Sequence, residues 1–167
     1  MRPSPTERLA FRSWRDDDLP LARALFGDAR VTALVGGPFD DDAVRARLES
    51  ERAMEREHGV QYWPIALHDG TPVGCCGLKP RPQPRVLEIG FYVAHAHWGR
   101  GYAVEAARSV VRHAFNVLRV EALFAGHHPE NLGSRRVIAA LGFAYTHDEL
   151  YPPTGLQHPG YLLRGPY

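Results

Sequence analysis

Long apolar runs and an excess of charge are both missing from the sequence. None of its apolar stretches approaches the roughly 20 residues that a membrane-spanning helix needs, and residues 1–5 lack the apolar core of a secretion signal. The 20 Lys and Arg residues are balanced by 19 Asp and Glu residues, whereas proteins that bind nucleic-acid backbones usually carry a basic surplus. We therefore expect a cytoplasmic protein with neither a membrane nor a nucleic acid as partner.

Lysine and cysteine are scarce as well. Lys79 is the only lysine among the 20 basic residues, and the arginines are scattered, which indicates coding bias more than a patch of phosphate-binding forks. The two cysteines, Cys75 and Cys76, are adjacent in the chain. They lack the second pair that a zinc site needs and are poorly placed to bridge each other. This predicts reduced thiols and no metal centre.

The composition that is present is that of a globular protein, with 44% hydrophobic and 23% charged residues. The length of 167 residues is close to that of one ordinary domain, and there is no internal repeat or long linker. We expect a single domain over residues 1–167.

The apolar pattern predicts strands followed by alternating helices and strands. Strands are expected at 9–14, 62–68, 72–78, 88–93, 121–125, 143–148 and 161–164. Helices are expected at about 16–29, 43–57, 103–118 and 134–141. The charge run in the second helix favours a solvated face with opposite-charge pairs over a docking surface. This order of elements predicts an α/β or α+β fold with a mixed sheet.

A glycine-rich segment, Trp98-Gly99-Arg100-Gly101-Tyr102-Ala103, lies between an expected strand and an amphipathic helix. Its glycines let the backbone turn tightly and approach a ligand, and the free N–H groups of the first helical turn favour an anion. A nucleotide-hydrolase loop is excluded because no Gly-Lys-Ser/Thr follows, and the dinucleotide fingerprint fails because Ala106 replaces its third glycine. A bare turn is the alternative to a phosphate site.

With this loop, the sequence resembles the GCN5-related N-acetyltransferases (the GNAT family), whose loop reads Gln/Arg-x-x-Gly-x-Gly/Ala. Trp98, Gly101 and Ala103 fit that pattern except at the first position. The chain is most similar to the branch typified by the ribosomal-protein N-terminal acetyltransferases. Four motifs occur in its order from Thr6 to Phe143: Thr6-Glu7-Arg8-Leu9-Ala10-Phe11-Arg12, Glu88-Ile89-Gly90-Phe91, the glycine loop, and Asn131, Ser134, Arg136, Gly142 and Phe143.

The resemblance implies an α+β fold: a twisted mixed sheet of about seven strands, splayed into a V between the fourth and fifth strands, with about four helices. It implies acetyl-CoA as co-substrate, lying between the strands at 88–93 and 121–125. The implied cofactor-binding residues are Trp98, Gly99, Arg100, Gly101, Tyr102 and Ala103 at the pyrophosphate, Phe91, Tyr92 and Val93 along the pantetheine, and Asn131, Ser134, Arg135 and Arg136 at the start of the last helix. For Asn131, an ordinary loop or helix-cap residue is the alternative.

Acetyl transfer to an amine needs a neutral amine, a donor for the oxyanion and a proton for the thiolate. Glu88 is the candidate base, with a strand-end ion pair as its alternative, and a backbone N–H near Phe91 or Tyr92 would meet the oxyanion. Many family members have a tyrosine that acts as the general acid at the position of Ile138. Ser134 is therefore the candidate proton donor to the thiolate, and a residue that only caps its helix is the alternative. We interpret His95, His97, His127 and His128 as solvated loop histidines.

The sequence therefore predicts an acetyl-CoA-dependent N-acetyltransferase, with a protein N-terminal α-amine as the leading acceptor. An α-amine of pKa about 8 is far more often neutral at pH 7 than a lysine amine of pKa about 10.4. The alternatives are an enzyme acting on a small amine (an antibiotic, a polyamine or an amino acid) and a non-catalytic CoA-binding module. A monomer and a homodimer are both compatible with the sequence.

Overall fold

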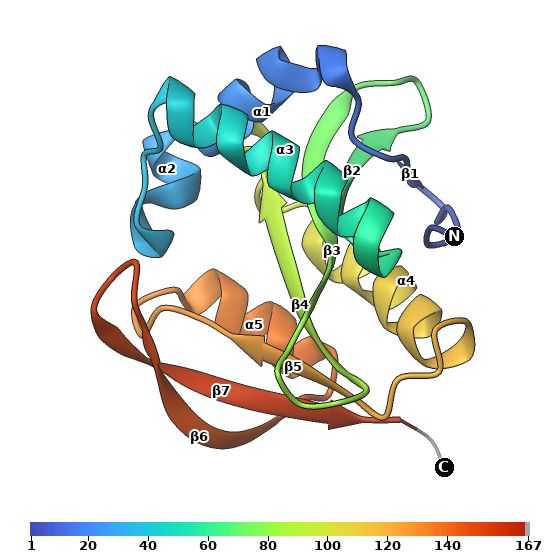
Figure 1. Cartoon of the computed structure of the whole chain (residues 1–167), viewed down its shortest axis with the longest axis vertical. Coiled ribbons are helices and arrows are strands. Elements are labelled where there is room, and N and C mark those ends of the chain that lie inside the picture. Colours follow the sequence, from blue (N-terminus) through green and yellow to red (C-terminus); the bar gives the residue numbers. More distant parts are fainter. Residues whose placement is uncertain (166–167) are drawn as a thin grey trace.

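The computed structural model, which describes residues 1–165, is built around a mixed sheet with helices on both faces (Figure 1). Within those residues the sheet has seven strands, in the order β1 (Leu9–Phe11), β2 (Tyr62–Leu67), β3 (Pro72–Pro80), β4 (Val86–Val93), β5 (Ala122–Gly126), β7 (Leu156–Arg164) and β6 (Ala144–Tyr151). Only β4 and β5 pair in parallel in this part of the chain. The expected α+β fold with a mixed sheet is confirmed.

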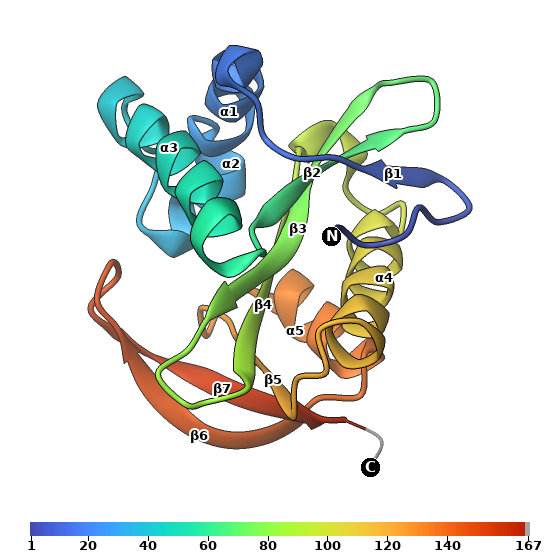
Figure 2. The ribbon, with the colours of Figure 1, turned by 45° about the vertical axis from the view of Figure 1, so that its right-hand side comes forward.

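The helices divide between the two faces of the sheet (Figures 1 and 2). On one face lie α1 (Leu19–Phe26), the short α2 (Ala29–Thr32) and α3 (Asp41–His58), and on the other lie α4 (Tyr102–Asn116) and α5 (Leu132–Ala140). Short 3-10 turns occur at Asp16–Asp18, Ala33–Val35 and His95–His97. None of the helices in the described part of the chain is long and apolar enough to cross a membrane.

The sheet opens between its two parallel strands. Paired positions run from Val86 with Ala122 to Glu88 with Phe124, and the register gives no further pair along residues 1–165, although β4 continues to Val93. The strands therefore separate beyond Glu88, as the resemblance implied.

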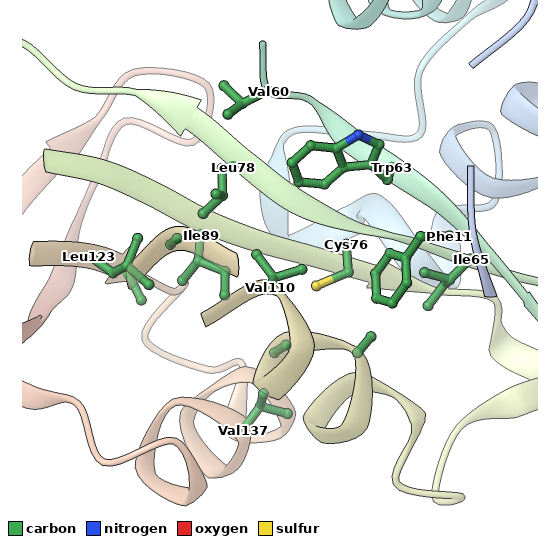
Figure 3. Close-up of a cluster of buried hydrophobic side chains, with 14 of the residues drawn as sticks. Phe11, Val60, Trp63, Ile65, Cys76, Leu78, Ile89, Val110, Leu123 and Val137 are labelled. Atoms are coloured by element: carbon green, nitrogen blue, oxygen red, sulfur yellow. The ribbon is translucent and has the colours of Figure 1, made fainter. Parts of the chain in front are cut away.

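Alternating side chains of the central strands build a separate core on each face. Toward α4 and α5, Cys76, Leu78 and Ile89 pack with Val110 and Val137 (Figure 3). On the other face, α1 and α3 pack over a cluster that includes Cys75 and Tyr62. Both thiols are buried and free, and burial raises the pKa of each.

Two expected elements have different bounds for identifiable reasons. The first strand stops at Phe11 instead of residue 14, because the next partner, Pro64, accepts a bond from Arg12 N but has no N–H to return. The helix expected over 16–29 is broken: it begins as a 3-10 turn before Pro20, and Gly27 caps the end of α1.

The other differences are smaller. The last helix begins at Leu132 rather than 134, because Asn131 caps it. The strand β7 begins at Leu156 rather than 161, directly after a turn in which Gly155 takes a φ of +68°.

Candidate functional site

The loop between β4 and α4 adopts a conformation that requires glycine. Gly99 and Gly101 have φ angles of +72° and +78°, in the left-handed region. Gly101 is the N-cap of α4, and its carbonyl accepts the first helical bond, from Glu105 N, at 3.1 Å. The preceding N–H groups of α4 have no partner within the helix. No atom lies within 4 Å of a Cβ built on Gly99, so the loop is open to a ligand.

The N-terminal motif holds this loop in place, a role that sequence reasoning did not find. Thr6 Oγ1 donates to Glu105 Oε1 at 2.5 Å, and Arg8 Nε donates to Glu105 Oε2 at 2.6 Å. Arg8 also donates to the Arg100 carbonyl at 3.0 Å, and its guanidinium lies 4.6 Å from the centre of the Tyr102 ring. A cation therefore stands beside the glycine loop.

The register of β3 and β4 decides which backbone groups face the splay. Ala94 N donates to Val73 O, and bonded pairs alternate along an antiparallel ladder. The backbone groups of Tyr92 consequently point to β3, whereas those of Phe91 and Val93 point to the opening. Of the two oxyanion donors considered from the sequence, only the Phe91 N–H faces the gap.

Trp98, which departs from the family pattern, lies against this same edge. Its indole Nε1–H donates to the Val93 carbonyl at 2.7 Å, and its ring packs on His95 with centroids 4.8 Å apart. The indole is therefore already bonded to a backbone carbonyl that the family resemblance assigns to pantetheine. The Trp98 side chain remains half exposed.

The start of α5 lies at the same end of the parallel strands as the glycine loop, because it follows β5 as the loop follows β4. Asn131 Oδ1 accepts from Ser134 N at 2.9 Å, so Asn131 is the helix cap and its amide nitrogen is left to donate elsewhere. Ser134 does not cap α5, and that alternative is wrong. One turn on, Ile138 is buried in the core. Arg135 and Arg136 are exposed, and neither forms an ion pair within residues 1–165.

Glu88 lies at the base of the splay and is held by two cations. Its carboxylate oxygens meet Lys79 Nζ at 2.9 Å and Arg81 Nη1 at 3.2 Å. Arg81 also pairs with Glu149 at 2.5 Å and covers the Phe124 ring at 3.9 Å. The ion-pair alternative for Glu88 is thus present in the structure, and any proton acceptance by this carboxylate must compete with both cations.

Tyr62 and Tyr92 cover the sheet next to Glu88, on the face opposite α4 and α5. Gly90 makes room for Tyr62: a Cβ at that position would lie 2.3 Å from the Tyr62 hydroxyl. Burial raises the pKa of both phenols, that of Tyr92 to about 12. They are therefore neutral, and their rings line this face.

Two members of the charge run on α3 turn inward to these tyrosines, so the expectation of a wholly solvated helix face is wrong. Glu51 is 1% exposed and accepts from Tyr62 N at 2.7 Å. Arg47 donates from Nε to Glu51 at 2.7 Å and lies over the rings of Tyr62 and Tyr92. In the sequence, Arg47 and Glu51 are one more i, i+4 pair of opposite charges on a charged helix, so their burial could not be predicted from the pattern.

The expectation of solvated histidines is also wrong for His127 and His128, which are 6% and 7% exposed. His127 bonds the His128 carbonyl and the Tyr161 hydroxyl, and His128 packs edge-on to the buried His158. No group of three His, Cys, Asp or Glu side chains in the described residues is placed to hold a metal ion.

Acetyl-CoA fits the groups described here. A Cβ on Gly99 would stand in open space, the first amides of α4 have no partner within the helix, and the edge of β4 from Ile89 to Val93 has no strand partner within residues 1–165 on the side of β5. These are the needs of a pyrophosphate and an extended amide-bearing arm.

Comparison with known proteins agrees with this geometry. A family model described as "Acetyltransferase (GNAT) domain" matches residues 8–144. The uncharacterized protein YkkB of Bacillus subtilis is 34% identical over 146 residues, 84% of each chain. FsC-acetyl coenzyme A-N(2)-transacetylase of Aspergillus fumigatus is 31% identical over 147 residues, which are 78% of this chain and 61% of that protein.

Solved structures share the fold. An acetyltransferase from Agrobacterium tumefaciens superposes with a TM-score of 0.85 at 27% identity, covering 98% and 95% of the two chains. A Mycobacterium smegmatis RimJ in complex with CoA-disulfide gives 0.78 at 22% identity, covering 98% and 89%. A Vibrio cholerae spermidine N-acetyltransferase, solved with CoA and spermine, gives 0.78 at 14%, covering 93% and 95%. Family members use acetyl-CoA, and the chain belongs to the GNAT family of acetyltransferases.

Proposed function

We propose that this acyltransferase moves the acetyl group of acetyl-CoA directly onto a primary α-amine, with a protein N-terminus as the leading acceptor. The observation that carries the proposal is the opening of the sheet beyond Glu88, with the glycine loop at one end and a carboxylate at the other. Acetyl-CoA supplies an activated thioester there.

The residues that would bind acetyl-CoA follow from these positions. Gly99, Arg100, Gly101, Tyr102 and Ala103 offer amides to the pyrophosphate. Trp98 and Val93 border the arm, and the backbone of Phe91 pairs with it. Asn131 donates its free amide nitrogen to the arm, and Ser134 lies one turn away. The unpaired guanidinium groups of Arg135 and Arg136 meet the adenosine phosphates.

Three groups of this chain would serve the chemistry. Glu88 accepts a proton from the incoming ammonium group, either directly or through water. The Phe91 N–H stabilises the oxyanion. Ser134, whose hydroxyl is not used for capping, donates a proton to the departing thiolate. A thiol of pKa about 8.5 is a good leaving group, so a weak donor is sufficient.

The choice of an α-amine rests on energetics. Deprotonating an α-amine of pKa about 8 at pH 7 costs near 1.4 kcal/mol, against about 4.6 kcal/mol for a lysine amine of pKa about 10.4. A proton passed to Glu88 must compete with its ion pairs to Lys79 and Arg81, and the α-amine, which is more often neutral, depends less on that transfer.

A small amine is the second candidate acceptor, favoured by a contact across the open face. A Cβ built on Gly36 would lie 3.0 Å from Pro153 Cβ, so the end of the Ala33–Val35 turn touches the turn between β6 and β7 (Figures 1 and 2). We infer that this contact limits the room for a peptide more than the room for a small amine. The similar spermidine N-acetyltransferase and N(2)-transacetylase are named for such acceptors.

The test is a free-thiol release assay with acetyl-CoA against N-terminal peptides, peptides with lysine as their only free amine, and small amines. The proposal expects kcat/KM for the best α-amine to exceed that of any lysine peptide. A lysine peptide or polyamine turned over faster than every α-amine would refute the acceptor class, and absence of turnover with all three would refute the transfer itself.

A further inference from the structure

The guanidinium of Arg47 is a cation held in a fixed position, on the face of the sheet from which an acceptor would approach Glu88. Its guanidinium carbon lies 5.0 Å from the ring centre of Phe26, 5.3 Å from that of Tyr62 and 5.7 Å from that of Tyr92. Three rings from α1, β2 and β4 therefore restrict the planar group. Little conformational entropy remains to be lost when it binds a further partner.

Glu51 uses only a small part of the binding capacity of Arg47. The guanidinium has five N–H donors, and Glu51 accepts the one on Nε. The other oxygen of Glu51 accepts from the Tyr62 backbone, and one bond joins the carboxylate to Arg47. The guanidinium lies over the Tyr92 ring, and its terminal nitrogens have no carboxylate partner in the described part of the chain. The Arg47 side chain is 32% exposed, so part of it is open to solvent.

The last residue of β6, Tyr151, is influenced by the charge of this cation and by that of the candidate base. Burial raises the pKa of the Tyr151 phenol, which also lies within electrostatic reach of both Arg47 and Glu88. The ring stacks on His158, 4.6 Å between centroids. Glu88 and Tyr92 alternate onto the same face of β4, so an acceptor that reaches Glu88 lies on the face over which Arg47 is held.

We propose that Arg47 binds a carboxylate of the acceptor, so that the enzyme prefers amines that also carry this anionic group. The inference rests on the acetyl transfer proposed above and names its substrate class. A carboxylate matches the two parallel donors of a guanidinium edge. Two sources share this chemistry: the α-carboxylate of a free amino acid, and an acidic side chain next to a peptide N-terminus.

The experiment compares acceptors that differ only in this group: leucine with leucinamide, and Ala-Glu-Ser-Ala amide with Ala-Gln-Ser-Ala amide. Thiol release gives the acid-to-amide ratio of kcat/KM. Because a nearby carboxylate also raises the amine pKa, the informative quantity is the change of this ratio between wild type and variant. The double variant Arg47→Gln/Glu51→Gln leaves no buried charge unpaired. In this variant the acid-to-amide ratio of kcat/KM should fall about ten- to a hundredfold.

Matched variants separate binding from folding. Arg45→Gln, on the same helix, removes an exposed cation that pairs with Asp41, and should leave the ratio unchanged. If the double variant fails to fold, Arg47→Lys keeps the charge but loses the fork, and it should lower the ratio by a smaller factor. Titration calorimetry with the N-acetylated products compares the Kd of the acid with that of the amide, and so measures the same preference without turnover.

A fall confined to the leucine pair assigns the site to free amino acids, and a fall confined to the peptide pair assigns it to acidic N-termini. Ratios that are unchanged in both pairs, or acid and amide products that bind equally to wild type, overturn the inference. Turnover that persists in that case leaves the proposed transfer standing.

Discussion

Replacing Gly101 by alanine should separate anion binding from folding. Gly101 caps α4 with a φ of +78°, which an L side chain adopts at a cost of about 1–2 kcal/mol. A Cβ there would meet only Arg8 Nη2, at an ordinary 3.6 Å, so the backbone conformation and not a clash is what alanine disturbs. The melting temperature of a chain of this size should fall by about 2–8 °C.

Relief of that strain would turn the first amides of α4 away from the phosphates. Losing one hydrogen bond to a charged group costs about 1.5–3 kcal/mol, which corresponds to an increase of roughly ten- to a hundredfold in Kd for CoA. Gly142 provides the matched control, because its φ is +83° and no atom lies within 4 Å of its Cβ position. Gly142→Ala should lose similar stability and bind CoA normally.

The assay is titration calorimetry with CoA, with thermal melts on the same preparations. If Gly101→Ala melts like the Gly142 variant and binds CoA with the wild-type Kd, the glycine loop does not hold the phosphates and the reasoning is refuted.

Three further predictions concern Glu88, Ser134 and Glu105. Glu88→Gln should lower kcat by about ten- to a thousandfold with an unchanged Kd for acetyl-CoA, and the loss should shrink at high pH; a pH-independent loss would mean that its ion pairs are its only role. Ser134→Ala should lower kcat with little change in melting temperature, because Asn131 is the cap; full activity would remove the donor role. Burial raises the pKa of Glu105, but bonds from Thr6 and Arg8 outweigh it and hold that pKa below the ordinary 4.5. Its stabilisation is therefore present at neutral pH and lost as the pH falls below about 4.5. Glu105→Gln should lower the melting temperature at pH 7, and the difference from wild type should narrow on acidification; a constant difference would contradict this linkage.

The parts of the site that sequence could predict are those set by neighbours along the chain. Gly99 and Gly101 stand where a strand must turn into a helix, and only their positive φ angles allow that turn. Asn131 caps the helix that follows it, through a bond to the third residue on. The mixed sheet followed from the order of the elements, and its splay from the family resemblance alone.

The acceptor side was not predictable in this way. The charges of α3 form ordinary i, i+4 pairs in the sequence, and nothing local distinguishes Arg47 from Arg45. Only the backbone of Tyr62 and the rings above it turn Arg47 and Glu51 inward. His127 and His128 are buried because His158 and Tyr161, some thirty residues later, cover them.

The sequence by itself determined where the chain turns, which helices are capped, and where free amides gather for an anion, since each depends on backbone geometry over a few residues. Tertiary structure alone decided that Glu88 is held by Lys79 and Arg81, that the N-terminal motif supports the glycine loop through Glu105, and that Arg47 lies over the rings of Tyr62 and Tyr92. Those outcomes depend on desolvation and on partners brought from distant parts of the chain, and the energy of a charge is fixed only when its burial and its partners are both known.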